Sequence, residues 1–233
     1  MTKYVLVSDI HGNYPALQAV IDREGRDANY LILGDLFGLN AYPKKTLELL
    51  LSLENARILR GNHDTAIFHH NEGHVASDKL SEFELENTLS DLSESEIEWV
   101  ETLPSFCEIT DSEGQKICLT HAKPWPSESS GYEARNAGIP KGNVPHFASK
   151  VSDKYDYVFH GHTHDQYSLD CSQWSHNVQF VNPGSLGYDY TYSVVDTETG
   201  EVDAKSVEVD VDEIKDHIQD NLPEGAPHVS SWY

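Results

Sequence analysis

Strand and helix patterns alternate at the start of the 233-residue chain, and this alternation most limits how it can fold. Pro15 suits a first helical turn and Gly25 suits a helix end, so a helix is predicted between them. A strand–helix–strand–helix–strand order indicates right-handed crossovers in a parallel sheet, so we expect an α/β fold. The predicted elements of this part are strands at 3–8, 30–33 and 57–59 and helices at 15–24 and 46–53.

The rest of the chain mixes helices with further strands. The segment from 64 to about 103 is strongly acidic and is predicted to be helical, with a capping box formed by Ser93 and Glu96. The later elements are a hairpin at 106–110 and 116–120, strands at 155–159, 179–181, 191–196 and 202–209, and a last helix at 212–219.

A long segment, 122–144, is rich in Pro, Gly, Ser and Asn. A loop of that length inside a compact domain is usually functional or mobile. Whether it forms a lid stays open, because an irregular loop packed by its own aromatic residues fits the composition equally well. No repeat or domain boundary is visible, so we expect one domain over 1–220 and a poorly ordered tail at 221–233.

Five short polar motifs each lie just past the C-terminal end of a predicted strand. In open α/β sheets the ligand crevice lies outside the carboxyl ends of the strands, so we expect one crevice to collect all five motifs. In chain order they are Asp9-Ile10-His11, Gly34-Asp35, Gly61-Asn62-His63-Asp64, His121 and Gly161-His162-Thr163-His164.

The residue types in these motifs suit divalent metal ions. Carboxylate oxygen and imidazole nitrogen bind Mn, Fe, Zn or Ni ions, and the motifs contain no cysteine that would select a thiolate metal. On an extended chain, residues two apart point the same way, so Asp9 and His11 are predicted to hold one ion together. The same extended geometry is expected of His162 and His164.

Asp35 and Asn62 complete the expected donor set. A carboxylate such as Asp35 can bridge two cations, and Asn62 supplies a neutral amide oxygen. Two ions about 3.5–4 Å apart would clamp a phosphate and activate a bridging water. Each motif alone has a simpler explanation as a turn, a helix cap or a surface His, but five in this order favour a metal site.

These motifs resemble those of the calcineurin-like metallophosphoesterase superfamily, and Asn182-Pro183-Gly184-Ser185 is similar to a late turn of its small bacterial and archaeal members. The resemblance covers most of the chain and implies a four-layer α/β/β/α sandwich. His63 matches the residue that contacts the phosphate and assists the leaving group, so it is the expected catalytic residue. The implied ligands are Asp9, His11, Asp35 and His164 for one metal, and Asp35, Asn62, His121 and His162 for the other.

The chain departs from the superfamily's protein Ser/Thr phosphatases in one motif. Those proteins carry Gly-Asp-x-x-Asp-Arg-Gly, whereas this chain has Gly38 in place of the second Asp and lacks the phosphate-binding Arg. A carboxylate that would orient His63 is therefore missing from its expected place. Asp64 is better spaced to cap the following helix. These differences argue against a protein phosphatase.

The net charge of −23, from 39 acidic and 16 basic side chains, limits the possible partners. It repels nucleic-acid backbones and anionic membranes, so neither general nucleic-acid binding nor membrane binding is expected. Phosphate still binds where metal cations reverse the local sign. Salt adaptation could produce such a charge. No run of about 20 apolar residues and no signal-peptide pattern is visible, so we expect a cytoplasmic protein.

Two groups of residues are expected to lie outside the chemistry. His160 shares a strand face with His162, and we expect it to be buried behind the site rather than to bind metal. The cysteines, Cys107, Cys118 and Cys171, lack any metal-binding spacing, and we expect reduced, buried thiols.

The sequence therefore predicts an enzyme that hydrolyses phosphodiester or phosphomonoester bonds in a small molecule or nucleotide, by direct attack of a metal-bridging hydroxide. Two alternatives stay open. One is a binding or scaffold protein that keeps this fold without catalysis, and the other is a mononuclear zinc hydrolase in which Asn62 has no role. Retention of His63 beside a full donor set favours the enzyme. The identity of the metals, the substrate and the oligomeric state are not predicted.

Overall fold

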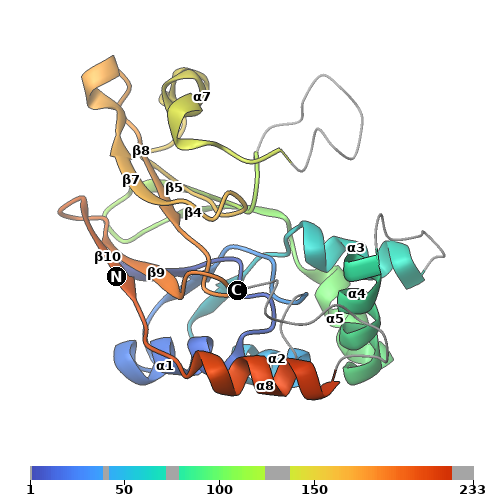
Figure 1. Cartoon of the computed structure of the whole chain (residues 1–233). Helices are drawn as coiled ribbons and strands as arrows, with labels where there is room; N and C mark the ends of the chain where they lie inside the picture. The colour runs from blue at the N-terminus through green and yellow to red at the C-terminus, as the bar shows by residue number, and fades with distance from the viewer. Residues whose placement is uncertain (1, 39–41, 72–78, 124–136, 222–233) are drawn as a thin grey trace.

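The computed structural model describes residues 2–38, 42–71, 79–123 and 137–221, with the backbone alone for 68–71, 79–84 and Asn221. Its strands form two five-stranded sheets that are stacked in Figure 1, with helices on the outer side of each. This mixed α/β arrangement confirms the expected fold class. The tail expected at 221–233 lies outside the described residues apart from Asn221, and so does 124–136 of the expected loop.

The first sheet has the strand order β10-β9-β1-β2-β3. Its three parallel strands are β1 (Lys3–Val7), β2 (Tyr30–Ile32) and β3 (Ala56–Ile58). On the other side of β1, β9 (Thr191–Asp196) pairs antiparallel with it and β10 (Glu201–Ser206) pairs antiparallel with β9. The predicted parallel crossovers are thus confirmed, and the C-terminal ends of β1, β2 and β3 reach one edge of the sheet.

The second sheet has the order β4-β5-β6-β8-β7. Parallel strands β5 (Lys116–Thr120), β6 (Tyr157–Phe159) and β8 (Gln179–Pro183) form its centre. The antiparallel edges are β4 (Phe106–Thr110) and β7 (Gln166–Asp170). The predicted hairpin is confirmed as β4 and β5. The strand β7 was not predicted, because its sequence, Gln-Tyr-Ser-Leu-Asp, has too few apolar residues for a clear strand pattern.

Helices α1 (Tyr14–Glu24), α2 (Pro43–Leu51) and α8 (Val211–Asn221) confirm three predicted helices, and they lie together below the first sheet in Figure 1. α1 begins after Asn13, whose side chain accepts the Ala16 N–H at 3.1 Å. α7 (Val144–Val151) lies beyond the second sheet and was not predicted. None of the described helices is long and apolar enough to cross a membrane.

The acidic segment forms the helices α3 (Asn62–Asn71), α4 (Lys79–Asp91) and α5 (Glu94–Thr102), which are grouped at one end of the sheets (Figure 1). α5 starts at the predicted capping box, where the Glu96 carboxylate accepts the Ser93 N–H at 2.8 Å. α3 starts at Asn62, so two predicted site residues lie in its first turn.

The parallel strands β1, from Tyr4 onward, and β2 are buried on both faces, as their continuous apolar sequences predict, whereas β3 is partly exposed. In β1, Leu6 points between the sheets, where it shares a core with Ile117 and Phe159 of the second sheet. The neighbouring side chain, Val5, points to the opposite face of the sheet, into a core that includes Leu17 of α1. Each such apolar side chain contributes about 1.5–3 kcal/mol on burial. This packing fixes the strand ends of both sheets relative to one another.

Candidate metal centre

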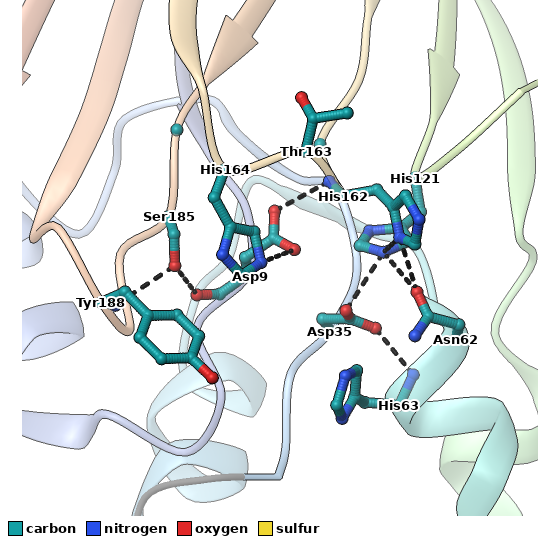
Figure 2. A network of polar contacts seen from close by, with 12 residues as sticks. Asp9, Asp35, Asn62, His63, His121, His162, Thr163, His164, Ser185 and Tyr188 are labelled. Carbon is teal, nitrogen blue, oxygen red and sulfur yellow. Dashed lines mark hydrogen bonds and ion pairs between the residues drawn. The ribbon is translucent and has the colours of Figure 1, made fainter. Parts of the chain in front are cut away.

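The predicted site residues lie at the C-terminal ends of strands from both sheets, where the structure brings them together (Figure 2). The loop after β1 carries two, the loop after β2 one, the first turn of α3 two, the connection after β5 one, and the connection from β6 to β7 two. In that order they are Asp9 and His11, Asp35, Asn62 and His63, His121, and His162 and His164.

One group of donors is centred on Asp9. Its carboxylate and the rings of His11 and His164 each offer a ligand atom, and these atoms lie within 4.8 Å of one another. His164 Nε2 lies 3.1 Å from Asp9 Oδ1. The second carboxylate oxygen, Oδ2, accepts the backbone N–H of His162 at 3.0 Å. Asp9 therefore contacts the backbone of His162, a residue whose side chain belongs to the second group of donors.

The second group is centred on His121. Its Nε2 lies 3.2 Å from Asp35 Oδ2 and 3.1 Å from Asn62 Oδ1. It also lies 3.3 Å from His162 Nδ1, which itself is 2.8 Å from Asn62 Oδ1. His121 Nδ1 is 2.8 Å from the carbonyl oxygen of Leu33, which only accepts, so the proton is on Nδ1 and Nε2 faces the group. Ligands bound at about 2.0–2.2 Å to one ion lie about 3 Å apart, which is the spacing observed here.

Asp35 belongs to both sides of the site. Besides its place beside His121 and His162, it forms a further group with His11 and His63, again with ligand atoms within 4.8 Å of one another. Its Oδ1 accepts the backbone N–H of His63 at 2.9 Å. The carboxylate is almost completely buried. Asp35 thus contributes a possible ligand atom to two groups of donors.

His11 has donor atoms that nothing in the described chain uses. Its ring is fully buried, and both Nδ1 and Nε2 lack a hydrogen-bond partner among the described residues. Burial lowers the pKa of His11 to about 4, against the opposing effect of nearby Asp35, so the ring is neutral and offers a lone pair. A neutral, buried and unpaired imidazole is a fitting metal ligand.

The buried carboxylates are charged through their histidine neighbours. Burial opposes ionisation of Asp35, but the positive charge of His121 outweighs it and holds the pKa of Asp35 well below its usual range. Burial also opposes protonation of His121, yet the charge of Asp35 raises the pKa of His121 to about 10. For Asp9, the hydrogen bond from His164 overcomes burial and lowers the pKa of the carboxyl. Positive charge is therefore required beside both carboxylates.

Five of these residues have left-handed backbone conformations, which non-glycine residues rarely adopt. Their φ angles are 53° for Asp9, 51° for His11, 52° for Asp35, 71° for His162 and 59° for His164. The expectation that Asp-x-His and His-x-His lie on extended chain is therefore wrong. His162 and His164 accordingly lie in different donor groups. Strained residues of this kind persist where the surroundings hold them, and they cluster at functional sites.

Hydrogen bonds between neighbouring loops hold these conformations. The loop after β1 pairs with the loop after β2 through Asp9 N–H to Gly34 O at 3.0 Å, and through His11 N–H to Asp35 O at 2.9 Å. Gly12 N–H donates to Leu36 O at 2.8 Å. The two ligand-bearing loops thus form one rigid unit.

The glycines of the motifs permit very close approaches between loops. A Cβ atom on Gly61 would lie 2.0 Å from Asp35 Oδ1, and one on Gly161 would lie 1.8 Å from Ser8 Oγ. Any side chain at these positions would therefore separate strand ends that carry site residues. This explains why Gly precedes the donors in both motifs.

Asp64 ties the Asp35 loop to the start of α3. Its Oδ1 accepts the N–H groups of Leu36 at 2.9 Å and Phe37 at 3.2 Å, and its Oδ2 accepts the N–H of Gly61 at 2.7 Å. Burial, together with the nearby negative charge of Asp35, raises the pKa of Asp64 to about 7. The carboxylate is engaged with backbone amides, in agreement with the expected capping role.

Gly38 lies beside His63, as the departure in its motif implied. A Cβ atom on Gly38 would lie 3.3 Å from the Nδ1 atoms of both His63 and His11. The rings of His11 and His63 meet edge to face, with centroids 4.8 Å apart and planes at 82°. Position 38 thus lies beside two site imidazoles, where the protein Ser/Thr phosphatases carry a carboxylate.

His160 is fully buried, in agreement with the expected role behind the site. Its Nε2 lies 2.8 Å from the Tyr167 hydroxyl, which donates to Ile139 O at 3.1 Å. Burial lowers the pKa of His160 to about 4, so the ring is neutral. All three cysteines are free thiols, and Cys118 and Cys171 are buried while Cys107 is partly exposed.

The sequence did not assign a role to the turn after β8. Here Asn182 donates to Thr163 Oγ1 at 2.9 Å and Ser185 Oγ donates to Asp9 O at 3.1 Å, so the turn supports two ligand-bearing loops. The ring of Tyr188 lies beside those of His11 and His164, with centroid distances of 5.4 Å and 5.0 Å. The Asn-Pro-Gly-Ser motif was the signal for this turn, but nothing in the sequence placed Tyr188 at the site.

Comparison with known proteins agrees with this geometry. The profile of the calcineurin-like phosphoesterase superfamily domain matches residues 2–200. Among curated proteins, no sequence matches significantly.

Solved structures are similar over nearly the whole chain. A hypothetical protein from Pyrococcus horikoshii OT3 has a TM-score of 0.76 and 23% identity, over 96% of this chain and 95% of its own. A metallophosphoesterase from Sphaerobacter thermophilus has a TM-score of 0.72 and 21% identity, with the same coverage of 96% and 95%. A protein described as a novel archaeal phosphodiesterase has a TM-score of 0.51 and 16% identity, over 88% and 99%. At these identities the likeness is one of fold.

Proposed function

The chain belongs to the calcineurin-like phosphoesterase superfamily, and we propose that it is a metal-dependent phosphoesterase acting on a small phosphate ester or a nucleotide. The observation that carries this proposal is the gathering of oxygen and nitrogen donors from five strand ends into adjoining groups. A scaffold without chemistry would not need His11 to be buried with both ring nitrogens unpaired.

Two divalent ions fit the residues present. All donors are carboxylate, amide or imidazole atoms, the set that Mn, Fe, Zn and Ni share. The distances of 3.1–3.3 Å from His121 Nε2 to its neighbours, and of 2.8 Å between His162 Nδ1 and Asn62 Oδ1, suit ligands of one ion. The first ion would be held by Asp9, His11, Asp35 and His164, and the second by Asp35, Asn62, His121 and His162.

Charge supports the same assignment. Two buried carboxylates, Asp9 and Asp35, lie in a chain of net charge −23. A phosphate would be repelled from such a site, because like charges repel. Bound cations would reverse the local sign and let an anionic substrate approach.

The proposed hydrolysis needs a nucleophile and a group that assists the leaving oxygen, and His63 is proposed for the second role. When bound, divalent ions polarise a phosphoryl group and supply a water of lowered pKa, the nucleophile of the proposed direct hydrolysis. His63 is held at the start of α3 by its N–H to Asp35 Oδ1 at 2.9 Å, with its ring against His11. In the proposed reaction it would stabilise the phosphoryl oxygens or protonate the leaving oxygen.

The substrate class follows from what the site lacks. The motif that carries a phosphate-binding Arg in protein Ser/Thr phosphatases has Leu39 after Gly38 instead. Gly38 stands in place of the usual carboxylate, so position 38 supplies no acidic group to orient His63. We therefore propose a phosphodiester, nucleotide, dinucleoside polyphosphate or small monoester rather than a phosphoprotein.

Activity on a panel of esters tests the proposal. Purified protein supplied with Mn²⁺ should hydrolyse at least one of bis-p-nitrophenyl phosphate, p-nitrophenyl phosphate and a dinucleoside polyphosphate. Asp35→Asn should lower kcat/KM at least about 100-fold, because a neutral amide binds cations more weakly than a shared carboxylate. Asp153→Asn, the same change at an exposed position, is the matched control.

Two outcomes would reject the enzyme. If the wild-type protein carries metal yet hydrolyses none of the panel, the scaffold alternative is favoured. If Asp35→Asn and Asp153→Asn both keep wild-type kcat/KM, any activity observed does not come from this site.

A further inference from the structure

Tyr188 lies on a turn whose backbone is fixed to the Asp9 loop. The Tyr188 N–H donates to Ser185 Oγ at 3.2 Å, and that hydroxyl donates to Asp9 O at 3.1 Å. Gly187 N–H donates to the same carbonyl at 2.8 Å, and Leu186 N–H donates to Ser8 O at 3.0 Å. The position of the tyrosine backbone is thus set by the same loop that carries Asp9 and His11.

The ring of Tyr188 forms one wall of the donor group that is centred on Asp9 and includes His11 and His164. Its centroid lies 5.4 Å from that of His11, with the planes at 74°, and 5.0 Å from that of His164, with the planes at 34°. The residue is only partly buried, so the wall stands between the donors and solvent rather than in the core. The phenol therefore lies beside the group, packed against two site imidazoles and partly exposed.

Tyr188 and His63 lie on two sides of one imidazole. His11 contacts the ring of His63 at 4.8 Å and that of Tyr188 at 5.4 Å. In Figure 2 the hydroxyl end of Tyr188 points away from its turn, and both this hydroxyl and the His63 ring lie on the side of Asp9 and Asp35 that is away from Thr163. A group bound over the His11 side of the site would therefore meet both side chains.

We propose that the Tyr188 hydroxyl donates a hydrogen bond to a phosphoryl oxygen of the substrate, opposite His63, an inference that rests on the proposed phosphoesterase function. A phenol is a neutral donor near pH 7, so it adds no charge beside the cations. Hydrogen bonds to charged oxygens are stronger than those between neutral groups. Tyr188 would therefore act as a substrate-binding residue, with the ring held by His11 and His164 and the hydroxyl directed at the phosphate.

Binding of inorganic phosphate to the Mn²⁺-loaded protein tests this assignment by calorimetry, without any turnover. Tyr188→Phe keeps the ring and removes only the hydroxyl, and it should raise the Kd for phosphate at least about tenfold with bound Mn²⁺ unchanged. KM for a hydrolysed ester should rise as well. Tyr190→Phe is the matched control, since the Tyr190 hydroxyl is buried without a hydrogen-bond partner in the described part of the chain.

The outcomes separate this inference from the proposed function. Equal phosphate affinity in Tyr188→Phe and wild type would overturn it and leave Tyr188 as a wall only, and so would a wild-type protein that binds no phosphate. If phosphate binding depends on the Tyr188 hydroxyl but no ester is hydrolysed, the inference stands and the proposed function fails.

Discussion

At the scale of single residues, His11 shows most clearly what the site requires. Its fully buried ring has two nitrogens without a partner among the described residues. Leaving one buried polar group unpaired costs about 1–3 kcal/mol, so such a residue persists only for a reason. A cation bound at one nitrogen would remove most of that cost.

Replacing His63 is expected to affect catalysis but not metal binding. We expect His63→Ala to lower kcat by about 10²–10⁴-fold, the usual contribution of a positioned acid or base. Bound metal should stay at the wild-type level, because the proposed ligand set does not include His63. Steady-state kinetics with metal analysis on the same preparation measures both.

His176→Ala, outside the site and partly exposed, controls for the loss of an imidazole. A His63→Ala variant that keeps wild-type kcat with full metal would contradict the catalytic assignment.

At the scale of elements, the sequence was informative where a pattern repeats. Apolar runs predicted β1 and the hairpin of β4 and β5, and the placing of a polar motif after each strand predicted where the donors gather. The left-handed conformations of Asp9 and His162 were not predicted, because residue spacing does not reveal φ angles.

Other elements escaped prediction for physical reasons. β7 is an edge strand with few apolar residues, so it has no strong periodic pattern. α7 carries Val144, Phe147, Ala148 and Val151 at helical spacing, but it is only eight residues long and follows a segment of loop-forming composition. Tyr188 reaches the site only because tertiary hydrogen bonds place its turn against Asp9, a residue far away in the sequence.

The contact between the end of β1 and the end of β6 gives a prediction at this scale. Gly161→Ala would bring a Cβ atom to 1.8 Å from Ser8 Oγ and 2.8 Å from Asp9 Oδ2. The loops would have to separate, at a cost of about 1–3 kcal/mol in the free energy of unfolding, and Mn²⁺ affinity should fall. Thermal melts with and without Mn²⁺ would show a lower Tm and a smaller metal-induced rise.

Gly142→Ala provides the control, because a Cβ atom there has nothing within 4 Å. If both variants melt and bind Mn²⁺ alike, the close approach of the two strand ends does not matter for the site.

At the scale of the whole molecule, the net charge of −23 acts against compactness. Exposed charges repel over about 10 Å at 0.1 M salt but only about 3 Å at 1 M. We therefore expect the Tm to rise between 0.05 M and about 1 M NaCl, which differential scanning calorimetry would measure. A neutral osmolyte at equal osmolarity should give a smaller rise, and a Tm that falls or stays constant with salt would show that self-repulsion is not a major term.

The proposed function depends on two metal ions bound at these strand ends, and the metal content per chain measures this binding. After equilibration with Mn²⁺ and removal of the excess, elemental analysis should find about two ions per wild-type chain. His11→Ala and His121→Ala each remove a donor from one group, so each should retain about one ion. A wild-type protein with a single ion would support the mononuclear alternative, and one with no bound metal would contradict the account.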